Sequence, residues 1–402
     1  MKYTEYELGQ INIEVIDGDR GKNYPHQDEL LEEGSCVFLS ANNVTPSGFK
    51  FDSVVYITEE KDKILRNGKL TRNDIVITTR GTVGNVGLFD NSVPFTDMRI
   101  NSGMLIVRCG EGVDYRYLYY VLRGGSFQKQ ILQIRTGTAQ PQLPKSHFLR
   151  MKVELPPIDI QQKIAKVLGT IDEKIKNNDV INENLEQQAA SYFYHQFIVN
   201  ADPSWKEGTI SDLGTVIGGS TPSKSKPEYY TDNGIAWITP KDLSVDKSKF
   251  ISHGADDITE LGLRNSSASI MPAGTVLFSS RAPIGYIAIA DGEVTTNQGF
   301  KSVVPNGNVG TAFVYYFLKN ALPTIENMAS GSTFKEISGS AMRTVPAMIP
   351  DDGSLQEFSD FCEPLFLQQR TLEAENRSLA ALRDSLLPKL MSGELDVSEL
   401  DL

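Results

Sequence analysis

The chain has 402 residues, enough for two or three domains, and its hydrophobic content of 40% and charged content of 22% are those of an ordinary globular protein. Its 39 Lys and Arg against 51 Asp and Glu give a formal charge of −12, which argues against a simple basic protein that coats nucleic acid but leaves room for local basic patches. No apolar run approaches the roughly 20 residues that span a bilayer, and the polar first residues do not resemble a signal peptide, so we expect a cytoplasmic protein.

The first part of the chain is predicted to form short strands, because short apolar runs alternate there with glycine, proline and asparagine. The predicted strands are Cys36–Leu39, Ser53–Ile57, Asp74–Thr79, Val86–Phe89 and Met104–Arg108. One helix is predicted around Tyr115–Gln133. Strands followed by a helix in this way indicate an α+β fold.

A long helix is predicted next, over Leu155–Gln196. Pro156-Pro157 ends the preceding segment, and Asp159 with Gln162 has the spacing of a capping box. Apolar and polar residues then recur in steps of three and four, which is typical of a coiled-coil seam: Ile164, Leu168, Ile171, Ile175, Asn178, Asn182, Leu185, Ala189 and Tyr192.

The polar, proline-containing segment Ala201–Gly208 is predicted to be a boundary, after which a second globular portion begins. Its predicted strands are Ala236–Ile238, Thr275–Ser279, Tyr286–Ala290 and Phe300–Val304. A helix is predicted around Val309–Ser330. The second portion therefore has the same α+β pattern as the first.

A second long helix is predicted near the C-terminus, where Ser354 and Glu357 have the spacing of another capping box. Its seam is Phe358, Phe361, Leu365, Gln368, Leu372, Glu375, Leu379, Leu382 and Leu386. Both seams are polar at their centres, which selects one register and one partner. We therefore expect Asp159–Phe197 and Ser354–Leu390 to form one antiparallel intramolecular coiled coil; the alternative is two unrelated amphipathic helices, each packed on its own domain.

The two portions also resemble each other in sequence. IVITTRGTVGNVGLFD at Ile75–Asp90 corresponds to VLFSSRAPIGYIAIAD at Val276–Asp291, which places Arg80 and Arg281 at equivalent positions. Asn101-Ser102-Gly103 corresponds in the same way to Asn297-Gln298-Gly299. The chain is thus predicted to contain a globular portion and a long helix, repeated once.

The sequence carries no recognisable catalytic motif. It has no phosphate-binding loop, and Gly81, Gly84 and Gly87 lack the dinucleotide-binding spacing, so they are better explained as turn residues. No Asn-Pro-Pro-Tyr type run is present that would hold a flipped adenine. The three cysteines and four histidines are scattered, which predicts neither a disulfide framework nor a metal site. We expect no cofactor on this chain.

Three segments of the chain carry a family resemblance: GTAQPQLPKSHFLRMKVELPPIDIQQKIAKVLGTID (Gly137–Asp172), LRDSLLPKLMSGEL (Leu382–Leu395) and DIVITTRGTVGNVG (Asp74–Gly87). Through these segments the chain resembles the specificity subunits of Type I restriction-modification enzymes. The second portion departs from the pattern at Gly331–Lys335 and Asp351–Gly353. The resemblance implies two target-recognition domains, each reading one half of a split double-stranded DNA sequence, held apart by two helices that pair antiparallel.

The resemblance also implies partners and boundaries. Two modification subunits, adenine-N6 methyltransferases that use S-adenosylmethionine, and restriction subunits that use ATP and Mg²⁺ would bind the chain.

A helix of about 40 residues is roughly 60 Å long, so it could separate two reading domains by about one DNA turn. The boundaries expected are residues 1–157 for the first recognition domain, 158–200 for the first spacer helix, 201–352 for the second domain, and 353–402 for the second helix and tail.

Residues that contact DNA are expected to be Arg and Lys for phosphates and guanine, and Gln for adenine. Arg80 and Arg281 are the strongest candidates, since both follow a predicted strand at equivalent positions. The remaining candidates are Gln140, Gln142, Lys145, Lys224, Lys226, Lys241 and Lys335. For each, the alternative is a structural role inside the domain. Two other functions stay open: a coiled-coil interaction protein that reads no DNA, and a nuclease with an unrecognised site.

Overall fold

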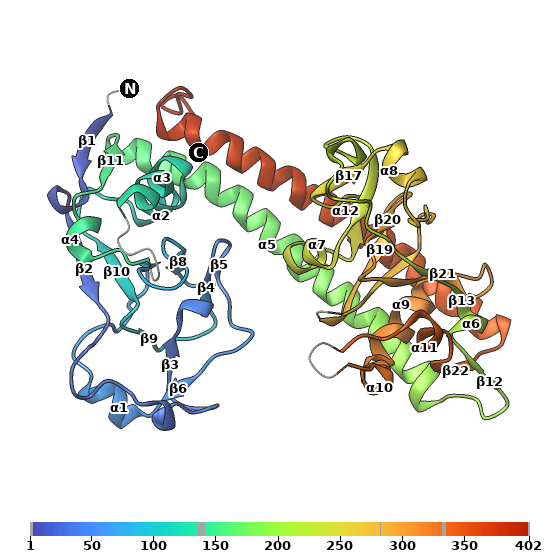
Figure 1. Ribbon diagram of the computed structural model, residues 1–402. Helices are drawn as coiled ribbons and strands as arrows, with labels where there is room; N and C mark the ends of the chain where they lie inside the picture. The colour runs from blue at the N-terminus through green and yellow to red at the C-terminus, as the bar shows by residue number, and fades with distance from the viewer. Residues whose placement is uncertain (1–2, 135–140, 282, 332–334, 401–402) are drawn as a thin grey trace. The chain divides into compact units, whose positions relative to one another are not determined.

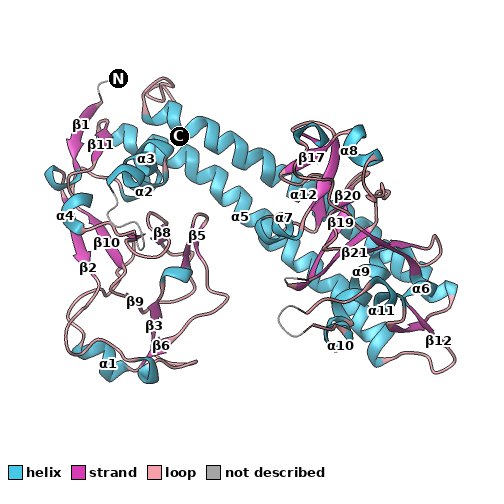
Figure 2. Cartoon of the chain, in the orientation of Figure 1, coloured by secondary structure: helices cyan, strands magenta, loops and turns pink. Residues whose placement is uncertain are grey.

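The computed structural model describes residues 3–134, 141–281, 283–331 and 335–400, which form two compact units (Figure 1). Unit 1 comprises Met1–Lys174 and Ser378–Leu402, and unit 2 comprises Ile175–Arg377. Each unit combines small sheets with helices, and each contains part of both long helices (Figure 2). Among the described residues, no helix has both the length and the apolar character that crossing a bilayer requires.

Unit 1 is built on a four-stranded antiparallel sheet in the order β2-β10-β7-β8. These strands are Ile13–Asp17, Met104–Cys109, Asp74–Thr78 and Val86–Phe89. A second sheet, β6-β3-β9, comprises Tyr56–Ile57, Cys36–Leu39 and Met98–Ile100, with β3 and β9 parallel. Two pairs complete the strands: β1 (Thr4–Glu7) with β11 (Lys152–Leu155), and β4 (Val44–Thr45) with β5 (Gly48–Phe49).

The core of unit 1 lies on both sides of the four-stranded sheet, because β7 is buried on both faces. One side packs against the first long helix and the C-terminal tail, through residues such as Leu118, Phe148, Leu168 and Leu390. The short helices of this unit are α1 (Glu59–Ile64), α2 (Tyr115–Arg123), α3 (Gly125–Ile134) and α4 (Lys145–Phe148). Tyr3 donates from its hydroxyl to the carbonyl oxygen of Leu390 at 2.7 Å, which ties the tail to the start of the chain.

Unit 2 repeats this arrangement, with a sheet in the order β13-β21-β18-β19-β16. Its strands are Gly214–Gly218, Lys301–Pro305, Val276–Ser280, Ile284–Ala290 and Phe250–Ile251. The second sheet, β14-β17-β15-β20, comprises Tyr230–Thr231, Asp256–Ile258, Ile235–Ile238 and Thr295–Thr296, and β12 (Lys206–Thr209) pairs with β22 (Pro346–Ile349). The parallel pairing of β15 with β20 corresponds to that of β3 with β9. The internal repeat predicted from the sequence is therefore confirmed at the level of strand pairing.

The helices of unit 2 differ in one respect from the prediction. Each helix predicted between the sheet and the long helix is two helices: α9 (Gly310–Asn320) and α10 (Leu322–Met328) here, and α2 and α3 in unit 1. Gly124, with extended backbone, separates the unit 1 pair, and a proline in the first turn of α10 marks the break in unit 2. The other short helices are α6 (Ile210–Leu213), α7 (Pro240–Val245), α8 (Glu260–Arg264) and α11 (Gly339–Arg343).

The two long helices are α5 (Ile158–Tyr194) and α12 (Asp352–Met391) (Figure 1). A π-helical turn at His195–Val199 follows α5 directly. In unit 1, Arg383 donates to the Asp172 carboxylate at 2.8 Å. In unit 2, Asn178 donates to Glu375 and to Asn376, each at 2.8 Å, and the rings of Tyr192 and Phe361 stack at 4.7 Å. As the residue number rises along α5 it falls along α12, which confirms the antiparallel coiled coil.

The predicted helix starts were partly wrong. The carbonyl oxygen of Pro157 accepts from the amides of Ile160 and Gln161, each at 3.0 Å, so Asp159 lies inside the first turn of α5 rather than capping it. The α12 helix is capped by Asp351, whose carboxylate accepts from the amide of Ser354 at 3.0 Å. Hydrogen bonds from the amide and the hydroxyl of Ser354 and from the indole of Trp205 lower the pKa of Asp351 to about 2.

The predicted seam of α12 was also displaced in places. Gln369, 3% exposed, takes the place expected for Gln368, and its amide donates to the carbonyl oxygen of Asn182 at 3.1 Å. Phe361 and Leu382 remain partly exposed, at 36% and 47%. The reason is that α12 packs on globular structure as well as on α5: in unit 2, Cys362 is fully buried in the main core.

Candidate nucleic-acid interface

In unit 1, three loops meet at the end of β7. The amides of Thr79 and Arg80 donate to the carbonyl oxygen of Gly103, at 2.7 and 3.2 Å, and the amide of Leu143 donates to the carbonyl oxygen of Thr79 at 3.0 Å. Arg80 also forms a backbone bridge with Gln142. The strand end therefore holds Arg80 and Gln142 side by side, and among the described residues the Arg80 guanidinium has no hydrogen-bond or ion-pair partner.

Unit 2 has the same junction at the end of β18. The amide of Ser280 donates to the carbonyl oxygen of Gly299 at 2.7 Å, and the amide of Ile337 donates to that of Ser280 at 3.1 Å. Arg281 forms a backbone bridge with Glu336. Arg80 and Arg281 thus occupy equivalent places in space as well as in sequence, with Gln142 equivalent to Glu336.

The two junctions differ in charge. In unit 2, the Glu336 carboxylate lies 3.6 Å from the Arg281 guanidinium and 3.6 Å from the Lys301 ammonium. The side chains of Arg281 and Glu336 are 37% and 38% exposed, and ion pairs at such exposure are weak, so Arg281 can exchange this partner for a phosphate. In unit 1 the neutral Gln142 leaves Arg80 without a competing carboxylate.

The other residues predicted to bind DNA have different surroundings. Lys145 donates from its ammonium to the carbonyl oxygen of Val15 at 2.6 Å, which favours the structural alternative for this lysine. Lys224, Lys226 and Lys335 are exposed on loops, and the Lys226 ammonium lies 5.2 Å from the ring centre of Tyr229. Lys241 is exposed in the first turn of α7. Gln140 lies outside the described residues.

The prediction from the sequence did not include two basic residues that lie near the junctions. Lys301 is only 14% exposed and lies 3.4 Å from both the Ser280 hydroxyl and the carbonyl oxygen of Gln298. Arg20 donates to the carbonyl oxygen of Ser102 at 3.3 Å and to the Asp17 carboxylate at 3.0 Å. Neither has an equivalent basic residue in the other unit, so the internal repeat could not have indicated them.

Unit 2 also contains a buried ionic cluster between its sheet and both long helices. The Lys249 ammonium forms an ion pair with Glu186 and donates to the Gln369 amide oxygen at 2.7 Å. Tyr316 donates to the Glu186 carboxylate at 2.8 Å, and Lys319 pairs with it at 2.6 Å. Burial opposes ionisation of Glu186, but the two lysines outweigh it and lower its pKa to about 2. This cluster fastens the globular part of unit 2 to α5 and α12.

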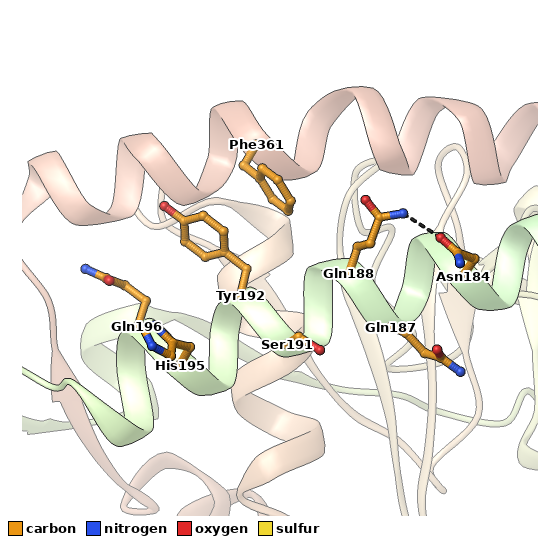
Figure 3. Close-up of a pocket in the computed structure, with 8 residues that line it drawn as sticks. All are labelled: Asn184, Gln187, Gln188, Ser191, Tyr192, His195, Gln196 and Phe361. Atoms are coloured by element: carbon orange, nitrogen blue, oxygen red, sulfur yellow. Dashed lines mark hydrogen bonds between the residues drawn. The ribbon is translucent and has the colours of Figure 1, made fainter.

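A groove of about 690 Å³ lies along α5 in unit 2 (Figure 3). It is lined by amide, hydroxyl and imidazole side chains and by two aromatic rings: Asn184, Gln187, Gln188, Ser191, Tyr192, His195, Gln196 and Phe361. Gln188 donates to the Asn184 amide oxygen at 2.6 Å. Within the described ranges there is no group of three His, Cys, Asp or Glu side chains that could hold a metal ion.

Comparison with known proteins identifies the family. Residues 2–187 and 203–379 match the sequence model of the Type I restriction modification DNA specificity domain. The chain belongs to this family. Its two matched segments cover both globular parts and most of both long helices, so the repeat consists of two specificity domains.

Individual relatives agree with this assignment. The MjaIX specificity subunit of Methanocaldococcus jannaschii is 39% identical over 178 residues, which is 42% of this chain and 41% of that protein, less than half its length. The HindI specificity subunit of Haemophilus influenzae is 22% identical, with 98% of this chain and 99% of that protein aligned. The crystal structure of a Type I S subunit from M. genitalium has the same fold, with a TM-score of 0.59, 18% identity, and coverage of 97% of this chain and 96% of that one. Specificity subunits recognise DNA and do not catalyse a reaction. This chain therefore has a recognition role rather than a catalytic one.

Proposed function

We propose that this chain reads a bipartite target in double-stranded DNA, with one half read by each unit. The observation that carries the proposal is the matched junction at the ends of β7 and β18, where Arg80 and Arg281 lie on equivalent rigid strand ends. Two such reading sites in one chain recognise two short sequences. Recognition domains at residues 1–157 and 201–352, with spacer segments at 158–200 and 353–402, would correspond to the two half-sites and the gap between them.

The proposed DNA contacts follow from the side chains at each junction. Arg80 and Arg281 would bind phosphate or guanine, and Gln142 would bind adenine. Lys224, Lys226, Lys241 and Lys335 are exposed and would bind phosphates. Gln140 would bind an adenine edge. Lys145 would bind a phosphate only after giving up its hydrogen bond to the carbonyl oxygen of Val15. Phosphate contacts position a protein on the duplex, whereas contacts to base edges provide its sequence preference.

The proposed partners are two adenine-N6 methyltransferase subunits and the restriction subunits of a Type I enzyme, in the cytoplasm. We infer that S-adenosylmethionine, Mg²⁺ and ATP act on those partners and that no cofactor binds this chain. The groove along α5 supports a scaffolding role, because its amide side chains offer hydrogen bonds to a protein surface without burying an unpaired charge.

A binding-site selection with the chain assembled on its methyltransferase subunits tests the proposal. Two defined sequence blocks separated by a fixed gap are expected. Arg281→Ala should reduce enrichment of one block and Arg80→Ala that of the other, each by about 5- to 150-fold if the arginine binds guanine. Enrichment of a single uninterrupted block, or of none, would contradict the proposal.

The alternatives give different results in the same preparation. A coiled-coil interaction protein that reads no DNA would bind the methyltransferase without enriching any sequence. A nuclease would cleave DNA when the purified chain is incubated with Mg²⁺, whereas the proposed function predicts no cleavage.

A further inference from the structure

Both units contain the same turn before their central strand. In unit 1 it is Asn101-Ser102-Gly103, between β9 and β10; in unit 2 it is Asn297-Gln298-Gly299, between β20 and β21. The Asn101 side-chain oxygen accepts from the amide of Gly103 at 2.8 Å, and the Asn297 oxygen accepts from that of Gly299 at the same distance. The two turns therefore share one hydrogen-bonded conformation.

Neighbouring backbone holds each turn from two sides. The glycine carbonyl oxygen of each turn accepts an amide hydrogen from the end of the adjacent strand, at 2.7 Å in both units. On the other side, a Cβ at Gly18 would lie 2.0 Å from the carbonyl oxygen of Asn101, and one at Gly219 would lie 2.0 Å from that of Asn297. No side chain would fit at either glycine, so the neighbouring backbone packs directly against the turn and, together with the hydrogen bond to the glycine carbonyl oxygen, supports the central residue.

The central residue is where the two turns differ. Gln298 is exposed, whereas the shorter Ser102 is partly exposed. Thr221 donates from its hydroxyl to the Gln298 amide oxygen, which orients the amide. Among the described residues, the side-chain amide nitrogen of Gln298 has no acceptor. The Lys301 ammonium lies 3.4 Å from the backbone carbonyl oxygen of Gln298. The result is an exposed, oriented hydrogen-bonding group beside one basic side chain, that of Lys301.

We propose that Gln298 and Ser102 are specificity-determining residues that contact base edges, one in each half-site, an inference that rests on the proposed function. The amide of Gln298 would donate to N7 of an adenine, and its oxygen, which has a second lone pair, would accept from N6. Thr221 is a positioning residue for this contact. Ser102, with one hydroxyl, can pair with several bases and should discriminate less.

The test uses the chain assembled with its methyltransferase subunits and measures binding to every single-base-pair variant of its own target. Gln298→Ala should reduce discrimination at one base pair of one half-site by about 5- to 150-fold. All other positions should keep their preferences. Gln298→Glu, which keeps the shape but can only accept, should change the preferred base at that same position to cytosine.

Two further variants separate reading from folding. Thr221→Val should weaken discrimination at the same base pair while binding to unrelated DNA stays unchanged. Gln356→Ala removes an exposed glutamine of α12 in the same unit, away from the turn, and should leave every preference unchanged.

Unchanged discrimination at all base pairs in folded Gln298→Ala and Gln298→Glu proteins would overturn the assignment of Gln298. An equal loss of affinity for every sequence would also overturn it, since that is the behaviour of a phosphate contact. If the unaltered complex shows no sequence preference, the proposed function itself fails, which is a distinct result.

Discussion

Lys249 is a buried cation, with its side chain only 6% exposed. Its ammonium lies 4.1 Å from the ring centre of Phe366 and pairs with Glu186 from α5. Burial lowers the pKa of Lys249, and the charge of Glu186 opposes that effect. The Glu186 carboxylate is therefore the main group that favours the charged state of this lysine.

Glu186→Gln should destabilise unit 2, because it leaves the buried Lys249 ammonium without its direct ion-pair partner. Loss of one partner of a buried pair costs about 3–5 kcal/mol, measurable by chemical unfolding of the full chain at neutral pH. Glu183→Gln, on the same helix but exposed, is the matched control and should have little effect. Equal stabilities for the two variants would show that the cluster does not anchor the unit.

Acid should affect the unaltered protein and the Glu186→Gln variant differently. The pKa of Glu186 is lowered to about 2 in the folded state, whereas an unfolded glutamate has a pKa of about 4.3. A lowered pKa adds stability above the unfolded value and loses it as the pH falls towards the folded value. Between about pH 4.5 and 2, the unaltered protein should lose stability that Glu186→Gln has already lost; parallel curves would contradict this.

At the same scale, the sequence predicted only part of the candidate site. The repeat placed Arg80 and Arg281 at equivalent strand ends, because matching runs of residues fold alike. It could not indicate Lys301 or Glu336, which meet only because separate loops converge. It also could not show that Lys145 is held by the carbonyl oxygen of Val15, a contact between residues far apart in the chain.

At the scale of elements, long-range periodicity was a better guide than local end signals. The extents of α5 and α12 were predicted within a few residues, since apolar positions recur over many turns. The predicted caps, Asp159 and Ser354, were wrong because residues nearer the start of each helix accept from its first free amides: Pro157, two residues earlier, through its carbonyl oxygen, and Asp351, three residues earlier, through its carboxylate. Short pairs such as β1 with β11 were missed, because a strand of four residues carries little pattern of its own.

The coiled coil allows a test of spacing by insertion near Asn178. Four added residues lengthen a helix by about 6 Å and rotate it by close to one full turn, so the seam keeps facing its partner. If helix length sets the distance between the two reading sites, the preferred gap between half-sites should grow by one or two base pairs, because each base pair adds roughly 3.4 Å along the DNA axis. The half-site sequences should stay the same.

Methylation of duplexes with graded gaps measures this preference. A two-residue insertion at the same place serves as the control, because it rotates the following seam by about 200° and should destabilise the protein. An unchanged gap in a folded four-residue variant would show that the helices do not act as a spacer.

For the whole molecule, the duplicated architecture predicts separable recognition. Replacing residues 1–157 with the equivalent part of a relative should change one half of the recognised sequence and leave the other half intact. The replacement segment must fit the remaining core of unit 1, in which Ile164, Leu168 and Leu390 are buried. It should also carry a hydroxyl equivalent to that of Tyr120, which donates a hydrogen bond to the Asp172 carboxylate at 2.7 Å. Binding-site selection would check the outcome, and changes in both halves would contradict separate reading.

The charge of −12 predicts how affinity should depend on salt. Because the chain is acidic, binding should rely on a few local Lys and Arg contacts and on the partner subunits. The logarithm of the affinity of the assembled complex should fall linearly with the logarithm of salt concentration, by about 0.9 per phosphate contact. The isolated chain should bind weakly at physiological ionic strength, and tight, salt-insensitive binding by the chain alone would contradict this.

The discontinuity of unit 1 has a consequence for synthesis on the ribosome. Ser378–Leu402 is made about two hundred residues after Lys174, a delay of roughly 10 to 40 s at about 5–20 residues per second. Until then, the core that Leu390 and Val397 close remains open on one side. Unit 2 is continuous from Ile175 to Arg377, so its synthesis is complete before that of unit 1. The nascent chain therefore exposes apolar surface for many seconds, and products that end early should be recognised by chaperones and proteases as unfinished.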